Sequence, residues 1–239
     1  MENTNKLIFF GLIIGLSLVF SAGIVSKTFL DVKNLDNVIS VSGSAKQKVT
    51  SDSARWIGNF SRIVTTENLK NGYNQMKGDE KTVNDFLIAQ GFKDTFEISP
   101  VFMNEIYKND QNGPKEYNLT QNIEVKSEDV NKVKELAKNS GELAEKGIIF
   151  STNPVEYYYS KLPDLRISLL PEAIKDAKKR AEIIAGSSDK NIDSVKSVSM
   201  GVVQVMSVGG VDVSDYGTYD TSAIEKEVMI TVKTIFSLK

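Results

Sequence analysis

The chain has 239 residues, of which 41% are hydrophobic and 25% are charged, and its formal net charge at pH 7 is −2. A chain of this size and composition can bury a core, which excludes a disordered chain and a disulfide scaffold. It contains no Cys and no His, which excludes Ser-His-Asp and Cys-His nucleophile systems, Cys/His zinc sites, haem held by His or Cys, and thiol redox chemistry.

The first predicted element is a membrane segment near the amino terminus. Leu7 to Val25 is an apolar run without charge that lies between Lys6 and Lys27. At about 1.5 Å per residue, a helix of this length spans the roughly 30 Å hydrocarbon core of a bilayer. A cleaved secretory signal is the alternative, because small residues lie near the end of the apolar run, at positions 21–23. Both interpretations place the rest of the chain outside the cytoplasm.

The apolar run therefore sets the expected organisation of the chain. No second apolar run is long enough to span a membrane, so the remainder is expected to form one soluble body on the far side. We expect a cytoplasmic leader at residues 1–6, an anchor or uncleaved signal at 7–29, a linker at 30–36 and a folded domain at 37–239.

The domain is predicted to begin with strands and an amphipathic helix. Asn37 to Val49 alternates around Gly43, which indicates two short strands with a turn or bulge between them. Ser53 to Thr65 alternates at period two and predicts a long strand with one buried face. Apolar residues at spacings of three and four predict a helix over Glu67 to Gln90, with Gly91 at its C-terminal end.

A hairpin and a second helix are predicted next. Thr95 to Tyr107 and Glu116 to Lys126 are β-rich runs, and residues 109–114 between them contain the Asn-Gly pair typical of hairpins. Ser127 is the predicted N-terminal cap of a helix that ends at Gly147.

The last third of the domain predicts a strand, a helix and two closing strands. Ile148 to Lys161 is a long strand broken at Pro154, which favours an edge position or a bend. Pro163 to Ala185 is a helix whose small residues allow close packing on one stripe: Ala173, Ala177, Ala181, Ile184 and Ala185. Ile192 to Val208 and Ile224 to Leu238 are the closing strands, joined by a loop rich in Gly, Asp, Ser and Tyr.

These elements predict an α+β fold. Mixed or antiparallel sheets of long strands would carry three amphipathic helices packed on them, after one N-terminal transmembrane helix.

Several segments resemble one protein family. Val38 to Gly43, followed by Lys48 to Ala54, resembles the opening "V-x-V-x-G … V-x-x-D-x-A" of the SIMPL-domain family, which includes periplasmic immunogenic proteins of bacteria. Ala173 to Ala185 resembles the most distinctive segment of that family, "A-x-x-D-A-x-x-R-A-x-x-I-A". The resemblance spans about Val38 to Leu238, and the chain departs from it at Asn191 to Asp193, where the family has a Gly-rich turn.

The resemblance implies a bacterial envelope protein that is periplasmic, surface-exposed or membrane-anchored. Members are loosely linked to oxidative or envelope stress, and some form ring-like or channel-like oligomers. The family offers no catalytic residues to carry over, so we expect no catalytic residue, no cofactor and no metal site. The matching positions are interpreted as structural: Gly43 in a bulge, Asp52 as an acceptor for backbone N–H groups at a turn, Ala177 and Ala181 in packing, and Arg180 in an ion pair with Glu172 or Asp176.

The loop between the closing strands is the candidate contact site. Tyr216 and Tyr219 are flanked by Gly and Ser, and tyrosines in such a setting suit protein or glycan contact. We therefore predict a contact loop that includes Asp215, Tyr216 and Tyr219. Cation binding by Asp212, Asp215 and Asp220 is the alternative, although the spacing matches no twelve-residue calcium loop.

The poor inventory of catalytic groups favours a non-enzymatic function. Ser44 with Lys46, and Ser187 with Lys190, are two Ser-Lys combinations that no third group orients. We expect an anchored interaction or assembly module whose partner is another copy of the chain or an envelope protein. The charge balance indicates no nucleic-acid partner. A small-ligand or lipid-binding domain and a carboxylate-based hydrolase of envelope glycans are the alternatives, which a closed apolar pocket and a carboxylate pair in a cleft would respectively favour.

Overall fold

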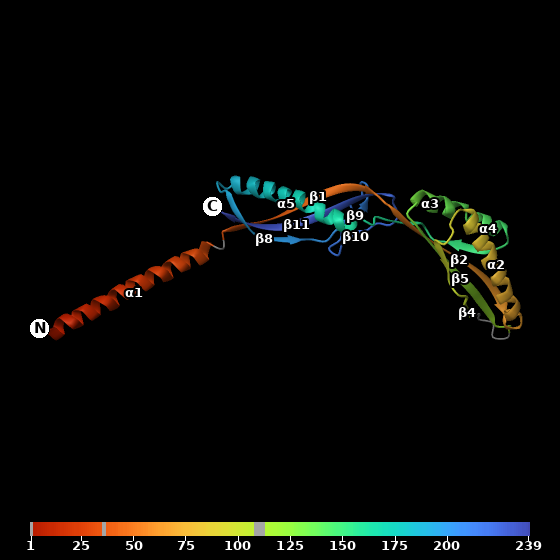
Figure 1. The fold of residues 1–239 in the computed structure, drawn as a ribbon, viewed down its shortest axis with the longest axis horizontal. Helices are drawn as coiled ribbons and strands as arrows, with labels where there is room; N and C mark the ends of the chain where they lie inside the picture. Colours follow the sequence, from red (N-terminus) through yellow and green to blue (C-terminus); the bar gives the residue numbers. More distant parts are fainter. Residues whose placement is uncertain (1, 35–36, 108–112) are drawn as a thin grey trace. The chain divides into compact units, whose positions relative to one another are not determined.

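The computed structural model describes residues 2–34, 37–107 and 113–239. The architecture is α+β, with two sheets in the described residues, as predicted (Figure 1). Two compact units are present. The first comprises Met1–Ala45, Leu169–Val202 and Ile230–Lys239, and the second comprises Lys46–Ser168 and Val203–Met229.

The N-terminal apolar helix is α1 (Glu2–Asn34). Its segment Phe10–Leu30 has 21 residues and a mean hydropathy of 1.8, and none of it is buried. By length and composition it is suited to cross a membrane, and a signal sequence has the same properties. The helix continues to Asn34 and so includes most of the predicted linker, while residues 35 and 36 lie outside the described residues.

The second unit contains an antiparallel sheet built on two long strands. These are β2 (Ser53–Thr65) and β5 (Glu116–Ser127), which pair from Ala54 to Thr65 along the whole of β5. The break predicted at Pro154 is confirmed, because it separates two short strands that both pair with β2. Four short strands complete the sheet: β3 (Phe96–Ile98) and β4 (Phe102–Ile106) beside β5, and β6 (Ile149–Thr152) and β7 (Glu156–Tyr158) beside β2.

The predicted hairpin is confirmed as antiparallel pairing of β3 and β4 with β5, although its first strand is split in two. Between β3 and β4, the Ser99 hydroxyl accepts a hydrogen bond from the Asn122 amide and holds the chain where it leaves the regular ladder. The predicted Asn-Gly turn includes Asn112, which lies outside the described residues.

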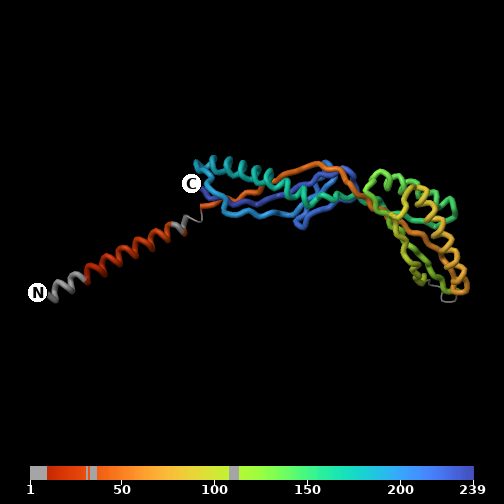
Figure 2. Tube along the Cα trace, in the orientation of Figure 1, coloured from red at the N-terminus to blue at the C-terminus, as the bar shows by residue number. Residues whose placement is uncertain are grey.

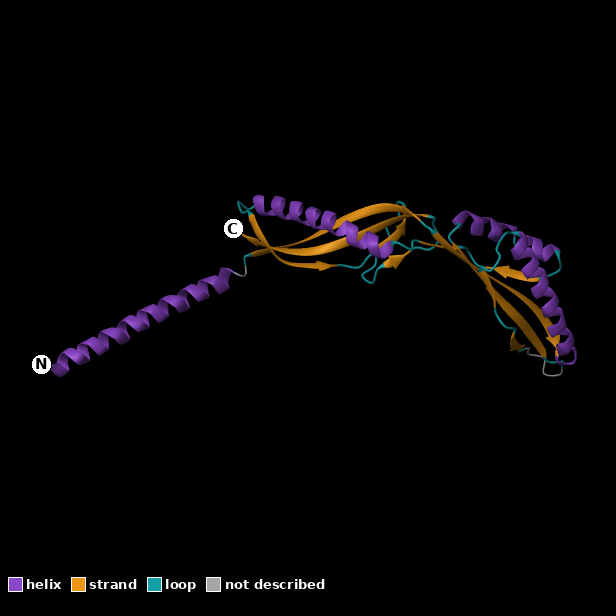
Figure 3. Cartoon of the chain, in the orientation of Figure 1, coloured by secondary structure: helices purple, strands orange, loops and turns teal. Residues whose placement is uncertain are grey.

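Helices cover one face of this sheet (Figure 3). They are α2 (Leu69–Ala89), α3 (Val130–Asn139) and α4 (Gly141–Glu145), and a short 3₁₀ turn, η1 (Thr66–Asn68), leads into α2. Gly91 and Gly147 have φ of +82° and +80° and follow α2 and α4, as expected of glycines that terminate helices.

The helix predicted after residue 127 differs from the structure in two respects. The N-terminal cap is Asp129, whose carboxylate accepts a hydrogen bond from the Lys132 amide, while Ser127 accepts one from the Asp129 amide. The helix is also interrupted at Ser140, whose hydroxyl donates to the Ala137 carbonyl. A side-chain bond back to the preceding turn competes with continuation of the helix.

The core of the second unit lies between the sheet and these helices. Trp56 and Phe60 on β2 are fully buried, and the Trp56 indole donates a hydrogen bond of 2.6 Å to the Thr152 hydroxyl. The alternation predicted for β2 is therefore confirmed. Other large apolar side chains buried in this core include Met76, Val83, Leu87, Phe92, Leu119, Ile123, Leu136 and Leu143.

The first unit is built around β11 (Glu225–Leu238), which pairs with β1 (Val38–Thr50) and with β8 (Ile192–Met200). The parts of β1 and β11 that lie side by side come from opposite ends of the domain sequence (Figure 2). The two short strands and turn predicted around Gly43 are wrong, because β1 is a single strand. In the second unit, β9 (Gln204–Ser207) pairs with the Lys226–Met229 part of β11, and β10 (Thr218–Tyr219) pairs with β9.

Helix α5 (Leu162–Gly186) carries the alanine stripe. Ala173, Ala177, Ala181 and Ala185 are at most 3% exposed, so close packing on this stripe is confirmed for the alanines. Ile184 was predicted to share the stripe, but its side chain is 49% exposed, because it lies one position before Ala185 and therefore on a different face of the helix.

Candidate functional site

The predicted contact site corresponds to the β9–β10 loop, Val208 to Gly217, whose base is held by a buried glutamine. Gln204 is 4% exposed. Its side-chain amide donates to the Ser214 carbonyl at 2.6 Å, and its carbonyl accepts from the Thr218 hydroxyl at 2.8 Å. The Ser214 amide also donates to Gln204, at 3.4 Å. One side chain on β9 therefore holds the C-terminal half of the loop.

A second polar group at the base is the Asp220 carboxylate. It accepts hydrogen bonds from the Ser222 amide and hydroxyl, both at 2.7 Å, and from the Ser207 amide at 3.1 Å. These bonds, those from Ser222 above all, lower the pKa of Asp220. The carboxylate is therefore ionised and its oxygens are engaged, as expected of a structural group.

Lys226 contacts the residues that follow the loop and is fully buried. Its ammonium donates to the Asp220 carbonyl and lies 5.7 Å from the centre of the Tyr219 ring. Burial lowers the pKa of Lys226, and the negative charge of Asp220 opposes that effect. A buried lysine with one carbonyl partner is costly to stability, so this contact fixes the end of the loop at the expense of desolvation.

The tip of the loop is apolar and open to solvent. The exposed fractions of its side chains are 43% for Val208, 85% for Val211, 61% for Val213 and 97% for Tyr216. Scattered exposed apolar residues are ordinary, but four of them within one short loop are a concentration that suits contact with a partner. Tyrosine is among the residue types enriched in such contacts.

A hollow of about 330 Å³ lies beside the loop. Its lining includes Ser207, Gly210, Asp212, Tyr219 and Asp220. Because Asp220 is engaged by Ser207 and Ser222, the hollow does not hold the two free carboxylates that a general acid and base would need.

The three predicted contact residues have different surroundings. Asp215 and Tyr216 are exposed on the loop. Tyr219 belongs to the base, because its hydroxyl accepts a hydrogen bond from the Tyr159 amide at 2.8 Å and its ring lies 5.9 Å from that of Tyr158. Gln204 and Lys226 are not among the residues predicted from the sequence. For Lys226 a signal exists, because it is in phase with the buried alternation of Val228 and Ile230.

The described residues offer little support for a Ser-Lys catalytic pair or for a metal site. Lys46 pairs with Glu227 at 2.8 Å and Lys190 donates to Asn37 at 2.9 Å, so neither lysine contacts the serine considered with it. In the described ranges no three Asp or Glu side chains form a group able to hold a metal ion.

Gly43 on β1 lies directly against α5. A Cβ added to Gly43 would come 2.3 Å from both the Ala173 carbonyl oxygen and the Ala177 amide nitrogen. Gly43 is therefore required by the close approach of strand and helix, and not by a bulge as predicted.

Two motif carboxylates fix backbone in the same way. Asp176 on α5 accepts from the Ser44 amide and from Arg180, both at 2.9 Å, and these bonds, first the one from Ser44, lower the pKa of Asp176. Arg180 thus pairs with Asp176, one of the two partners considered. Asp52 accepts from the Ser160 amide at 2.7 Å and the Ser160 hydroxyl at 2.8 Å. Ala181, the other matching alanine of α5, is fully buried, in agreement with a packing role.

A second exposed surface is strand β8 in the first unit. Within the described residues, β8 pairs with β11 alone, which leaves its other edge open. Val195, Val198 and Met200 are 52%, 43% and 46% exposed. An open edge with apolar side chains is a template for pairing with another chain.

A family model described as "SIMPL: Protein of unknown function (DUF541)" matches residues 39–236. The match covers both motifs that meet at Gly43 and α5, and it includes the β9–β10 loop and β8. No curated protein matches the chain.

Proposed function

The chain belongs to the SIMPL family, and on that basis we propose that it is a membrane-anchored interaction and assembly module of the bacterial envelope. Helix α1 is the anchor, the folded part lies outside the cytoplasm, and the module has no enzymatic activity. The observation that carries this proposal is the uncovered strand β8.

The apolar side of β8 continues the buried layer of its neighbour. Across the antiparallel ladder, Val198 faces Thr234 and Met200 faces Val232. Side chains that are paired in this way project from the same face of the sheet. Thr234 and Val232 are at most 1% exposed, whereas the two residues of β8 are nearly half exposed. The hydrophobic layer therefore ends in solvent at β8.

A second copy of the chain fits this edge. An antiparallel pair of β8 strands would satisfy the free backbone groups of both copies, and such a contact closes as a two-fold symmetric dimer. Burying the apolar side chains of both copies would stabilise the pair by roughly 25 cal/mol for each Å² of apolar surface removed from water.

The β9–β10 loop offers a separate surface for an envelope protein. Two observations support this role: the Tyr216 side chain is 97% exposed, and Gln204 holds the base of the loop in place. A preorganised aromatic tip loses little conformational entropy on binding.

Native mass spectrometry of the full-length protein in a mild detergent tests assembly. We expect a dimer or larger oligomer for the natural chain and a monomer for Val198→Asp, because the carboxylate would be desolvated in the interface. Ile88→Asp on α2 is the matched control, since Ile88 is 46% exposed. A natural chain that stays monomeric at every concentration would contradict the proposal.

A further inference from the structure

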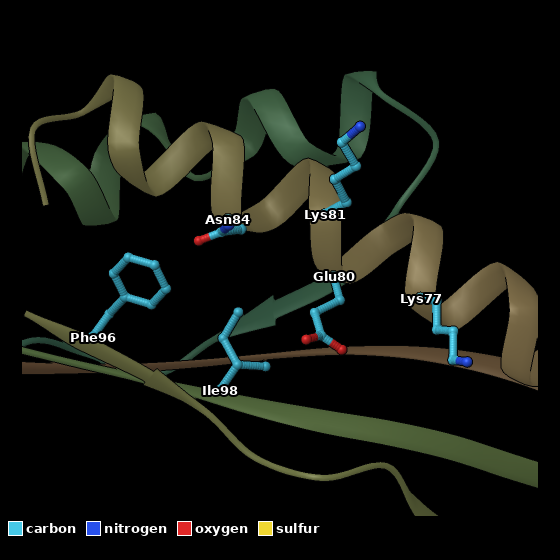
Figure 4. A pocket seen from close by; sticks show the side chains of 6 residues that line it. All are labelled: Lys77, Glu80, Lys81, Asn84, Phe96 and Ile98. Carbon is cyan, nitrogen blue, oxygen red and sulfur yellow. The ribbon is translucent and has the colours of Figure 1, made fainter. Parts of the chain in front are cut away.

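A groove of about 600 Å³ lies between α2 and β3 in the second unit (Figure 4). One stripe of α2 supplies Lys77, Glu80, Lys81 and Asn84, and β3 supplies Phe96 and Ile98. Figure 4 shows the two β3 side chains pointing toward α2, Glu80 pointing toward the strands, and Asn84 pointing toward Phe96. The volume is within the usual range of ligand sites, roughly 300–1,000 Å³.

The groove is bordered by two lysines and one carboxylate of α2. Neither Lys77 nor Lys81 has an ion-pair partner in the described part of the chain. The Glu80 carboxylate is the opposing charge, and it accepts a hydrogen bond of 2.9 Å from the Gln121 side-chain amide. Figure 4 shows Lys81 pointing away from the strands and Lys77 extending on their side, so Lys77 is the unpaired cation that favours a ligand with an anionic group.

The floor of the groove combines an aromatic ring with polar groups. Phe96 and Ile98 are partly buried, so the ring is fixed and one portion of it faces the groove. Asn84 presents an amide with two donors and an acceptor, and Glu80 presents acceptor oxygens. A ligand for this floor needs an apolar face for the ring and several hydroxyl or amide groups at its rim.

The Gln121 side chain, which hydrogen-bonds to Glu80, has one polar atom without a hydrogen-bond partner. Gln121 is 2% exposed, and its amide nitrogen donates to Glu80 and to the Ser99 carbonyl, at 2.9 and 3.0 Å. Its side-chain oxygen is buried without a partner. A buried acceptor without a donor is costly, and because this oxygen is enclosed by protein, an internal water molecule and not a ligand in the groove would relieve it.

We propose that this groove binds a saccharide that carries an acidic group. The C–H face of a sugar ring packs on Phe96, ring hydroxyls bond to Glu80 and Asn84, and the acidic group pairs with Lys77, while Lys81 adds positive potential at the rim. An acyl chain fits less well, because it would cover Glu80 and Asn84 without offering them hydrogen bonds. The site binds and does not hydrolyse, since Glu80 is the one carboxylate in the lining.

Isothermal titration calorimetry on the full-length protein in detergent tests the proposal with two matched probes. The disaccharide of N-acetylglucosamine and N-acetylmuramic acid carries a carboxylate, and N,N′-diacetylchitobiose is its neutral counterpart. We expect the acidic disaccharide to bind at least roughly tenfold more tightly. The double variant Lys77→Glu, Lys81→Glu should lose this preference, whereas Lys70→Glu, another exposed lysine of α2, should keep it.

Three results would overturn the proposal. They are equal or absent binding of the two disaccharides by the natural chain, unchanged binding by the double variant, and binding of dihexanoyl phosphatidylglycerol in place of either sugar. Because both lysines are exposed, the double variant should fold, and its melting temperature checks this. The groove belongs to the second unit and β8 to the first, so failure here leaves the assembly test unaffected.

Discussion

Gly43 and Ala173 approach so closely that a Cβ on the glycine would lie 2.3 Å from the Ala173 carbonyl oxygen. The two residues belong to the opening motif and the alanine-helix motif, which are far apart in the sequence. The structure explains both motifs by one contact. The glycine removes a side chain from β1 and the alanines remove bulk from α5, so that strand and helix pack backbone to backbone.

Gly43→Ala should destabilise the protein by about 1–3 kcal/mol or more, because the new methyl group meets backbone atoms that cannot rotate away. Thermal unfolding followed by circular dichroism measures the change. Gly78→Ala on α2 is the control, since nothing lies within 4 Å of its added Cβ, and it should stabilise the helix by about 0.5–1 kcal/mol. Equal melting temperatures for the two variants would contradict the packing argument.

Asp52→Ala should cost about 1–3 kcal/mol, because it removes the acceptor of two hydrogen bonds from Ser160. Denaturant unfolding gives the difference in free energy. Asp85→Ala, at an exposed position on α2, should change the free energy of unfolding by less than about 0.5 kcal/mol. A loss at Asp85 as large as at Asp52 would show that the Ser160 contact is unimportant.

Lys226→Met should flatten the pH dependence of stability at alkaline pH. The pKa of Lys226 is below its ordinary value of 10.5 in the folded protein, because the side chain is buried. Between the folded pKa and 10.5 the unfolded chain binds more protons, so stability of the natural chain rises with pH across that window. Methionine has no proton to lose. Melting temperatures from pH 7 to pH 10.5 measure both slopes, and identical slopes would contradict an ionisable lysine at this position.

Gln204→Ala should loosen the β9–β10 loop and leave most of the fold intact. The substitution leaves the Ser214 carbonyl and the Thr218 hydroxyl without their partner, at a cost of about 1–3 kcal/mol. Hydrogen exchange followed by mass spectrometry should show faster exchange in peptides from Val208 to Gly217 and unchanged exchange in β2 and β5. Unchanged exchange in the loop would mean that Gln204 does not hold it.

Regular features of the fold could be predicted from sequence because their cause is local. The alternation in Ser53 to Thr65 and from Val228 onward reflects one buried face per strand, and the alanine stripe reflects one buried face of a helix. The break at Pro154 is also local in cause, because proline has no backbone N–H to donate to the neighbouring strand.

The incorrect predictions concern residues whose role depends on segments far away in the sequence. Gly43 looks like a turn within its own segment, but the residue that requires it comes from α5, more than a hundred positions later. The contact loop could be located from its Tyr, Gly and Asp content. Its base depends on Gln204, whose burial follows from three-dimensional packing, and on Lys226, whose burial is indicated by the alternation of β11 but not by the charged side chain itself.

Cysteine cross-linking in the membrane tests the central claim, assembly through β8, most directly. The chain has no cysteine of its own, so Val198→Cys can form a disulfide only with another molecule. Under mild oxidation of the full-length protein we expect a covalent dimer of twice the chain mass, and no such product from Ile88→Cys, which is exposed on α2. A Val198→Cys protein that stays monomeric under these conditions, or an Ile88→Cys protein that cross-links equally well, would contradict assembly through β8.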